Sequence, residues 1–366
     1  MAFEIENGRL KRYHPEPGEK RVVIPQSVTV IGSHAFSGCQ NLEEVEIPYG
    51  VRHIVKAAFS KCTGLKTVLV SQGTIGDHAF DGCTGLTEAV MGPDVTSIGV
   101  HAFSGCKSLR SVSIAGENIQ IGSAAFKGCD ALADERGLCI VRGVLYDYIP
   151  KQKSEEVSIP EGVRIISALT FCHCTDLSRV RIAQSVTRIG ARAFEYCKSL
   201  QAVAFPSGLL EIGECAFLGC SSLHELEIPE GVSVIPGRAG GLEVGEFWCD
   251  PGVFEACTNL KRVVLHHGLT QIGIRAFYGC TSLSSVEIPD SVQDIGVWAF
   301  GDCPNLHTVR LAPQVKSIGW SAFDSPSSGG VRRVIIPAMP DGLEKERLLK
   351  LIRWRVSLDA DVVDET

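Results

Sequence analysis

One phrase recurs along the whole chain. The stretch "IGSHAFSGCQNLEEVEIP" at residues 31–48 returns as "IGIRAFYGCTSLSSVEIP" at residues 272–289. Aligned on the Phe of its Ala-Phe pair, the phrase occurs twelve times, at Phe36, Phe59, Phe80, Phe103, Phe126, Phe171, Phe194, Phe217, Phe254, Phe277, Phe300 and Phe323. The interval is 23 residues except for one of 21, one of 45 and one of 37. A fixed period of this length predicts a solenoid, in which each copy is one coil that rests on its neighbours.

The side-chain pattern within one copy predicts a strand. In "LEEVEIP", Leu42, Val45 and Ile47 should point inward and Glu44 and Glu46 outward, because side chains alternate along a strand. The same strand in the next copy should lie parallel to it. We therefore expect one long parallel sheet, built from one strand per copy.

The rest of each copy predicts a second face. An apolar pair such as Val28 and Ile31 should cross the opposite side in a short extended or irregular piece, closed by a Gly. The phrase Ala-Phe-x-x-Cys fits one short helical turn, because residues three apart share a face of a helix. The predicted fold is therefore a repeat solenoid of β/α type, with one long sheet and short helical turns on the other side.

Eleven of the fifteen cysteines lie three residues after the Phe of a copy. They are Cys39, Cys62, Cys83, Cys106, Cys129, Cys174, Cys197, Cys220, Cys257, Cys280 and Cys303. One thiol per coil would form a stack whose parallel Cβ vectors do not suit disulfides, so we interpret them as buried small hydrophobic residues. We expect no cofactor and no resident metal.

A zinc site is the alternative reading of two clusters. The stretch "FCHC" places Cys172, His173 and Cys174 together, but no second pair of ligands lies nearby in the repeat. His78 and His101 fall at the same position of consecutive copies and could stack, without a carboxylate or thiol in matching phase.

Two 23-residue segments resemble each other but not the repeat. Residues 3–25 align with residues 138–160, and both carry a Gly where a tight hairpin needs a positive φ, at Gly8 and Gly143. The first should cover the open end of the core, which terminal repeats must do. The second should mark a joint in the chain.

The end of the chain changes period. Asp341 and Glu344 have capping-box spacing, and the apolar residues that follow fall on one helical face, so a helix should cap the core. The predicted division is a hairpin cap (1–25), five copies (26–137), a hairpin insert (138–160), seven copies (161–340) with a loop insert (236–252), a capping helix (341–358) and an acidic tail (359–366). The tail should be disordered, or it is the stub of a longer natural protein.

Charge and hydropathy exclude two classes of partner. With 35 Lys and Arg against 42 Asp and Glu, the net charge is −7, which is unsuited to a nucleic-acid grip. No run of about 18 apolar residues occurs, so we expect no membrane insertion. The start "MAFEIENGRLKRY" has no secretory signal, so as written we expect a cytoplasmic protein, unless a leader has been removed.

The repeat phrase Ile-Pro-x-x-Val-x-x-Ile-Gly-x-x-Ala-Phe-x-x-Cys-x-x-Leu-x-x-Val resembles the BspA-type leucine-rich repeat, found in many bacterial surface proteins and some parasitic protists. The resemblance covers roughly residues 3–340. It implies a curved, right-handed leucine-rich-repeat superhelix, a role in protein binding or adhesion, and a location at the cell surface or outside the cell. It implies no catalytic residues.

The outward positions of the predicted sheet are the first candidates for binding a protein partner, because their charges alternate in blocks that suit a protein surface. They include Glu44, Glu46, Arg179, Arg181, Glu225, Glu227, Arg262, Arg310 and Arg333. Such a strip could equally be an ordinary solvated face. In the loop insert, Phe247 and Trp248 either anchor a partner or fold back on the solenoid.

The sequence thus predicts a monomeric, non-catalytic, protein-binding solenoid that acts as an adhesin or a scaffold. The alternatives are an intracellular interaction module of a larger chain and, less favoured, a metal-binding protein. An enzyme is disfavoured, because no strained nucleophile elbow, glycine-rich phosphate loop or paired-carboxylate setting is found.

Overall fold

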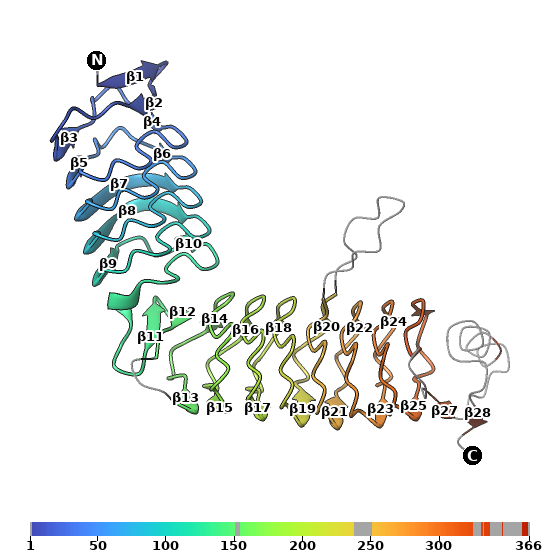
Figure 1. Ribbon diagram of the computed structural model, residues 1–366. Coiled ribbons are helices and arrows are strands. Elements are labelled where there is room, and N and C mark those ends of the chain that lie inside the picture. Colours follow the sequence, from blue (N-terminus) through green and yellow to red (C-terminus); the bar gives the residue numbers. More distant parts are fainter. Residues whose placement is uncertain are drawn as a thin grey trace. The chain divides into compact units, whose positions relative to one another are not determined.

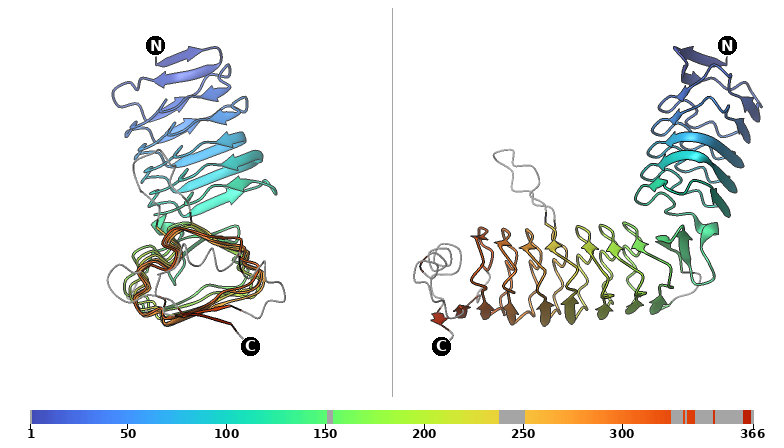
Figure 2. Two further views of the ribbon diagram at one scale, coloured as in Figure 1. Left: turned by 90° about the vertical axis from the view of Figure 1, so that its right-hand side faces the viewer. Right: turned by 180° about the vertical axis from the view of Figure 1, so that it is seen from behind.

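The computed structural model describes residues 2–150, 154–237, 251–324, 331, 333–336, 346 and 361–364. Figures 1 and 2 show two units, residues 1–151 and 152–366, and each unit is a stack of coils. Seen along the second unit, in the left view of Figure 2, its coils superpose. Each coil carries one strand on a first face and a short strand on a second face.

In the first unit, the first-face strands pair in parallel from β3 to β9. They are β3 (Arg21–Val23), β5 (Glu44–Glu46), β7 (Thr67–Ile75), β8 (Glu88–Ile98) and β9 (Ser111–Ile114). The second-face strands are β4 (Val30–Ile31), β6 (His53–Ile54) and β10 (Gln120–Ile121), joined through the long β7 and β8, which run across both faces. Of the predicted apolar pair, Ile31 therefore lies in a strand, and Val28 lies in the irregular piece before it.

In the second unit the same two ladders recur, as the two rows of strands in Figure 1. First-face strands are β13 (Glu156–Ser158), β15 (Arg179–Arg181), β17 (Ala202–Ala204), β19 (Glu225–Ile228), β21 (Arg262–Leu265), β23 (Ser285–Glu287), β25 (Thr308–Arg310), β27 (Arg333–Ile336) and β28 (Asp361–Asp364). Second-face strands are β14 (Ile165–Ile166), β16 (Arg188–Ile189), β18 (Glu211–Ile212), β20 (Val234–Ile235), β22 (Gln271–Ile272), β24 (Asp294–Ile295) and β26 (Ser317–Ile318).

The parallel first-face strands are confirmed, but the single long sheet is wrong. The ladder of hydrogen bonds is interrupted between β21 and β23 on the first face, and between β18 and β20 on the second. The stack of Phe rings nevertheless continues through both places, from Phe171 to Phe323. Core packing and the main-chain hydrogen bonds of the turns, rather than an unbroken sheet, therefore keep the coils of this unit together.

The predicted helical turns are also wrong, because the Ala-Phe-x-x-Cys segment consists of turns. In the first copy the amides of Ser37 and Cys39 bond three residues back, whereas those of Phe36 and Gly38 donate to Ala58 and Ser60 of the next coil, both at 2.8 Å. A helix would direct every amide back into its own turn. Amides that bond alternately within their own coil and to the next coil require a residue with a positive φ in each turn. His34, directly before Ala-Phe, has a φ of 58°.

Two other predictions concern the C-terminal end. The capping helix at residues 341–358 lies outside the described residues apart from Glu346, so it stays a prediction. The acidic tail, in contrast, is not without structure: Asp361–Asp364 forms β28, which pairs in parallel with β27. The tail therefore continues the first-face ladder by one strand.

The core of each unit is a column of stacked Phe rings. Centroids of successive rings lie 4.7 to 5.4 Å apart in the first unit, from Phe36 to Phe126. Beside them most inward Leu, Val and Ile side chains are buried, as Leu42 and Leu65 illustrate at 1% and 0% exposure, whereas Val45 and Ile47 are partly buried. Stacked, offset rings of this kind add to the burial energy of each coil.

Nine of the eleven ladder cysteines are buried, as the sequence indicated, whereas Cys39 and Cys174 are half-buried. The nine buried thiols also make a hydrogen bond that the sequence did not reveal, because each donates to the Phe carbonyl of the preceding coil. The Cys62 Sγ lies 3.1 Å from the Phe36 oxygen and the Cys220 Sγ lies 3.1 Å from the Phe194 oxygen. The fourteen cysteines that the structure describes are free thiols. The thiol therefore links neighbouring coils while filling a small apolar space.

Antiparallel hairpins lie at both ends of the first unit. β1 (Phe3–Glu6) and β2 (Arg9–Tyr13) turn at Asn7 and Gly8, and the ring of Tyr13 covers that of Phe36 at 4.9 Å. β11 (Leu138–Val141) and β12 (Val144–Tyr148) follow a short 3-10 helix η1 (Asp130–Leu132), and the ring of Tyr146 meets that of Phe126 edge-on at 5.2 Å.

The second hairpin is also held by a buried carboxylate. Asp147 accepts hydrogen bonds from the Nζ of Lys127 at 3.0 Å and from the amide of Gly128 at 2.7 Å, and its side chain is 9% exposed. A buried carboxylate with two such donors fixes the hairpin against the last coil of this unit.

The Gly that follows the second-face pair is needed for close approach of neighbouring coils. A Cβ built on Gly213 would lie 2.4 Å from the amide nitrogen of Ala191, which is backbone and cannot rotate away. We expect Gly213→Ala to lower the free energy of unfolding by about 1 to 3 kcal/mol, measured by urea denaturation. Gly208→Ala is the matched control, since the nearest atom to its Cβ would be 3.9 Å away; equal losses in both variants would contradict this account.

Candidate functional site

The first face carries the predicted binding residues, and most of their charges are already paired on the protein. In the first unit, Arg21 lies 3.6 Å from Glu44 and 3.4 Å from Glu46. All three side chains are more than half exposed. Exposed pairs of this kind contribute little to stability, but they lower the net charge that the face presents to a partner.

Pairing continues in the second unit. Glu156 lies 3.7 Å from Arg179 and 2.5 Å from Arg181, and Arg310 donates to Glu287 at 2.7 Å. Arg179 and Arg181 are thus drawn toward β13, away from the strand on their other side. That strand, β17, presents only methyl groups outward, at Ala202 and Ala204.

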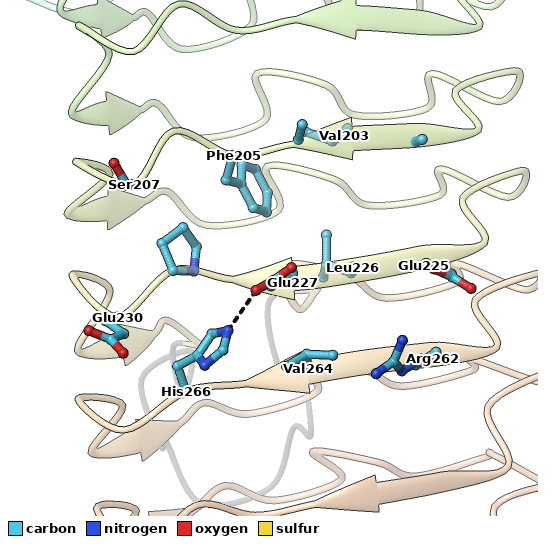
Figure 3. A pocket seen from close by; sticks show the side chains of 13 residues that line it. Val203, Phe205, Ser207, Glu225, Leu226, Glu227, Glu230, Arg262, Val264 and His266 are labelled. Carbon is cyan, nitrogen blue, oxygen red and sulfur yellow. Dashed lines mark hydrogen bonds and ion pairs between the residues drawn. The ribbon is translucent and has the colours of Figure 1, made fainter.

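A groove of about 660 Å3 opens beside these alanines, over β17, β19 and β21 (Figure 3). Its apolar part is formed by side chains of Ala202, Ala204, Phe205, Pro229 and Val264. The pair of alanines produces the depression because the neighbouring strands carry long side chains at the same register positions.

Phe205 forms the aromatic part of the groove. It stands where most other copies carry Ile or Leu, and two carry Val70 and Met91; its ring packs edge-on against the core ring of Phe217 at 5.5 Å. The side chain is half-buried, so one part of the ring belongs to the core and another faces the groove. The aromatic surface is therefore held rigidly.

Carboxylates dominate the rim. Glu225, Glu227 and Glu230 line the groove together with Arg262 and His266. The Nε2 of His266 lies 2.8 Å from the Oε1 of Glu227, as the dashed line in Figure 3 shows. Glu225 faces Arg262 in the strand register, but within the described residues neither the Glu225 nor the Glu230 side chain has an ion-pair partner.

The groove brings together three of the sequence-predicted residues, Glu225, Glu227 and Arg262. Arg333 is exposed on β27, which belongs to a different sheet from the groove strands β17, β19 and β21. Glu44 and Glu46 lie in the other unit. Phe247 and Trp248 lie outside the described residues.

Sequence reasoning missed Phe205 and His266 as surface residues of a site, whereas Val264 was identified as an outward position of the predicted sheet. The available signal was the outward pair Ala202 and Ala204, the one strand of the repeat with two methyl side chains outward. Two small outward side chains on one strand form a depression only when both neighbouring strands carry long side chains at the same positions. Recognising this requires the register of the three strands.

The two suspected metal clusters have ordinary structural contacts. His173 stacks on Tyr196 at 5.1 Å, and the Sγ of Cys172 lies 3.4 Å from the Oε2 of Glu195. The rings of His78 and His101 stack at 5.1 Å. Within the described residues, no group of three or more His, Cys, Asp or Glu side chains is placed to hold a metal ion.

One detail of the histidine prediction needs correction. A carboxylate does lie in phase with the His78–His101 stack, because the Oδ2 of Asp81 is 3.6 Å from the Nδ1 of His78. Burial and the neighbouring His78 lower the pKa of His101. One carboxylate beside two stacked imidazole rings makes a local contact and does not form a metal site.

Solved structures offer likenesses of low identity. A leucine-rich repeat protein from Bacteroides ovatus is 24% identical, with 95% of this chain and 84% of that chain covered and a TM-score of 0.49. The pneumococcal vaccine antigen PcpA is 16% identical, with 99% and 96% covered and a TM-score of 0.46. A leucine-rich repeat protein from Eubacterium ventriosum is 22% identical, with 72% and 83% covered and a TM-score of 0.46.

No curated protein matches the chain. Among the described residues, no helix has the length and apolar character needed to cross a bilayer. The model of the BspA type leucine rich repeat region matches six times, over residues 18–133, 147–239 and 250–339. These ranges include most of the coils described above, and the chain belongs to the BspA-type leucine-rich repeat family.

Proposed function

We propose that the protein is a non-catalytic binding module of the adhesin or scaffold type, and that it binds a protein partner on the first face of the second unit. The observation that carries the proposal is the groove over β17, β19 and β21. It combines a rigid apolar floor with a polar rim, which is the composition of a protein-binding hot spot.

The fold supports this use of the face. Backbone hydrogen bonds and the buried Phe column hold each coil, so the outward residues of the first-face strands are free of structural duties. Outward side chains of three successive strands line the groove, as Figure 3 shows. Such a surface suits a segment of another protein better than an enclosed small molecule.

A photo-crosslinking amino acid at position 204 tests the proposal. We expect discrete protein adducts from Ala204, which faces the groove, and none from the same group at Ser317, which is exposed on second-face strand β26 of the same unit. Adducts with the cell's own proteins would indicate a scaffold, and adducts with external matrix proteins an adhesin. Equal labelling from both positions, or none from position 204, would contradict binding at the groove.

A further inference from the structure

The groove has an apolar floor and an unbalanced rim, and the two together restrict what can occupy it. Phe205, Pro229 and Val264 offer surface to an aliphatic or aromatic group. The rim offers three carboxylates and one guanidinium. An occupant must therefore be apolar along its length and cationic at its end.

The distribution of charge around the floor strengthens this restriction. On one side, Arg179 and Arg181 are engaged by Glu156 and do not line the groove. On the other side stand Glu225 and Glu227, whose Cα neighbours across the ladder are Arg262 and Val264. Within the described residues, the ion-pair partner of Glu227 is His266, whose imidazole carries a full charge only when it is protonated.

Glu230 adds a third carboxylate at the end of β19, just past Pro229. Within the described residues its side chain has no cation beside it, and the same holds for Glu225. A cation that arrives from a partner can therefore contact Glu230 at one end of the groove, or Glu225 at the other end (Figure 3), without displacing an existing pair.

We propose that the groove receives a lysine side chain from a basic segment of a partner protein, with its methylene stem on Phe205 and Pro229 and its ammonium at Glu230, at the same end of the groove (Figure 3). This inference rests on the proposed protein-binding function and specifies the chemistry of the partner. Lysine fits because its four-carbon stem packs on apolar surface while its head stays polar.

Tetralysine and tetraornithine peptides test the inference on the full chain by calorimetric titration. Both carry the same charge, and ornithine is one methylene shorter. We expect tetralysine to bind about fourfold more tightly, the factor expected for one buried methylene. Binding of equal strength would show that only the overall negative charge attracts the peptides.

Charge-matched variants separate the groove from general attraction. E225Q/E230Q should weaken tetralysine binding about fivefold, because the ammonium contact at Glu230 is lost together with the contact that a second lysine of the peptide can make at Glu225. E44Q/E88Q removes the same charge from outward positions of the first unit, and we expect a change of less than about twofold. Equal losses in both double variants would overturn the inference.

The outcomes also distinguish this inference from the proposed function. If tetralysine fails to bind while Ala204 still crosslinks to a protein, the groove binds proteins but not through a lysine. If both fail, the groove is not a binding site.

Discussion

Raising the pH above about 8.5 is expected to destabilise the second unit steeply, by about 1.4 kcal/mol per pH unit for each ladder thiol that stays protonated in the folded state. Five ladder thiols of this unit have raised pKa values: Cys197, Cys220, Cys257, Cys280 and Cys303. Together they make the expected slope about 7 kcal/mol per pH unit.

The sign follows from where the protons are held. Burial raises the pKa of Cys257 and of Cys303 to about 12, whereas an unfolded thiol titrates near about 8.5. Above that pH the unfolded chain loses protons that the folded chain keeps, so alkali favours unfolding. The stabilisation is complete below about pH 8.5 and is lost as the pH rises toward the folded-state value.

Urea denaturation at a series of pH values, followed by tryptophan fluorescence, measures this slope. All four tryptophans belong to residues 152–366, so the signal reports on the second unit. Cys280→Ala should reduce the slope by about 1.4 kcal/mol per pH unit, because one titrating group is removed. A stability that stays constant between about pH 8.5 and 10, or a slope that Cys280→Ala leaves unchanged, would contradict burial of the thiols as the cause.

Phe194→Ala is expected to lower the free energy of unfolding by about 3 to 5 kcal/mol. The ring of Phe194 is fully buried and stacks between Phe171 at 4.9 Å and Phe217 at 5.0 Å. Its removal leaves a cavity that neither neighbour can fill, because both rings are held in their own coils by backbone hydrogen bonds. The loss of two ring contacts also weakens both interfaces between coils.

The same fluorescence titration measures the effect of Phe194→Ala. Leu210→Ala is the control, since Leu210 is also large and apolar but 61% exposed, and we expect a change within about 0.5 kcal/mol. A second unfolding step in the Phe194→Ala curve would show that the stack has separated into two cooperative parts at this coil. A loss no larger than that of the control would contradict the role of the column.

The sequence was sufficient to predict the strands, the inward residues and the repeat family, because these depend on a period of two along each strand and a period of 23 along the chain. Phe36 and its eleven equivalents could be placed in the core from spacing alone. These are local patterns, repeated often enough that a single copy with altered residues does not obscure them.

The helical turns were mispredicted because spacing alone cannot distinguish a helix from consecutive turns. Residues such as Phe36 and Cys39 share one side in either structure, and only the partner of each amide separates the two. That partner lies in the next coil. The hydrogen bond from Cys62 to the Phe36 carbonyl was missed for the same reason.

The sequence predicted a row of outward residues but not the groove. Glu225, Glu227, Arg262 and Val264 were identified from their outward register, whereas the contribution of Phe205 to the floor depends on how deep that half-buried side chain lies. Alternation along a strand gives the direction of a side chain and not its depth.

The alternating amide bonds of the turns have a consequence for how such a protein can change its partner. Since coil-to-coil spacing is set by main-chain bonds, thiols and rings, the two outward residues of β17, Ala202 and Ala204, can be exchanged without altering the coils above and below. Each first-face strand therefore offers two surface positions that can vary independently of the other coils. A new binding specificity can arise by substitutions at these positions, one coil at a time, without an insertion or a new fold.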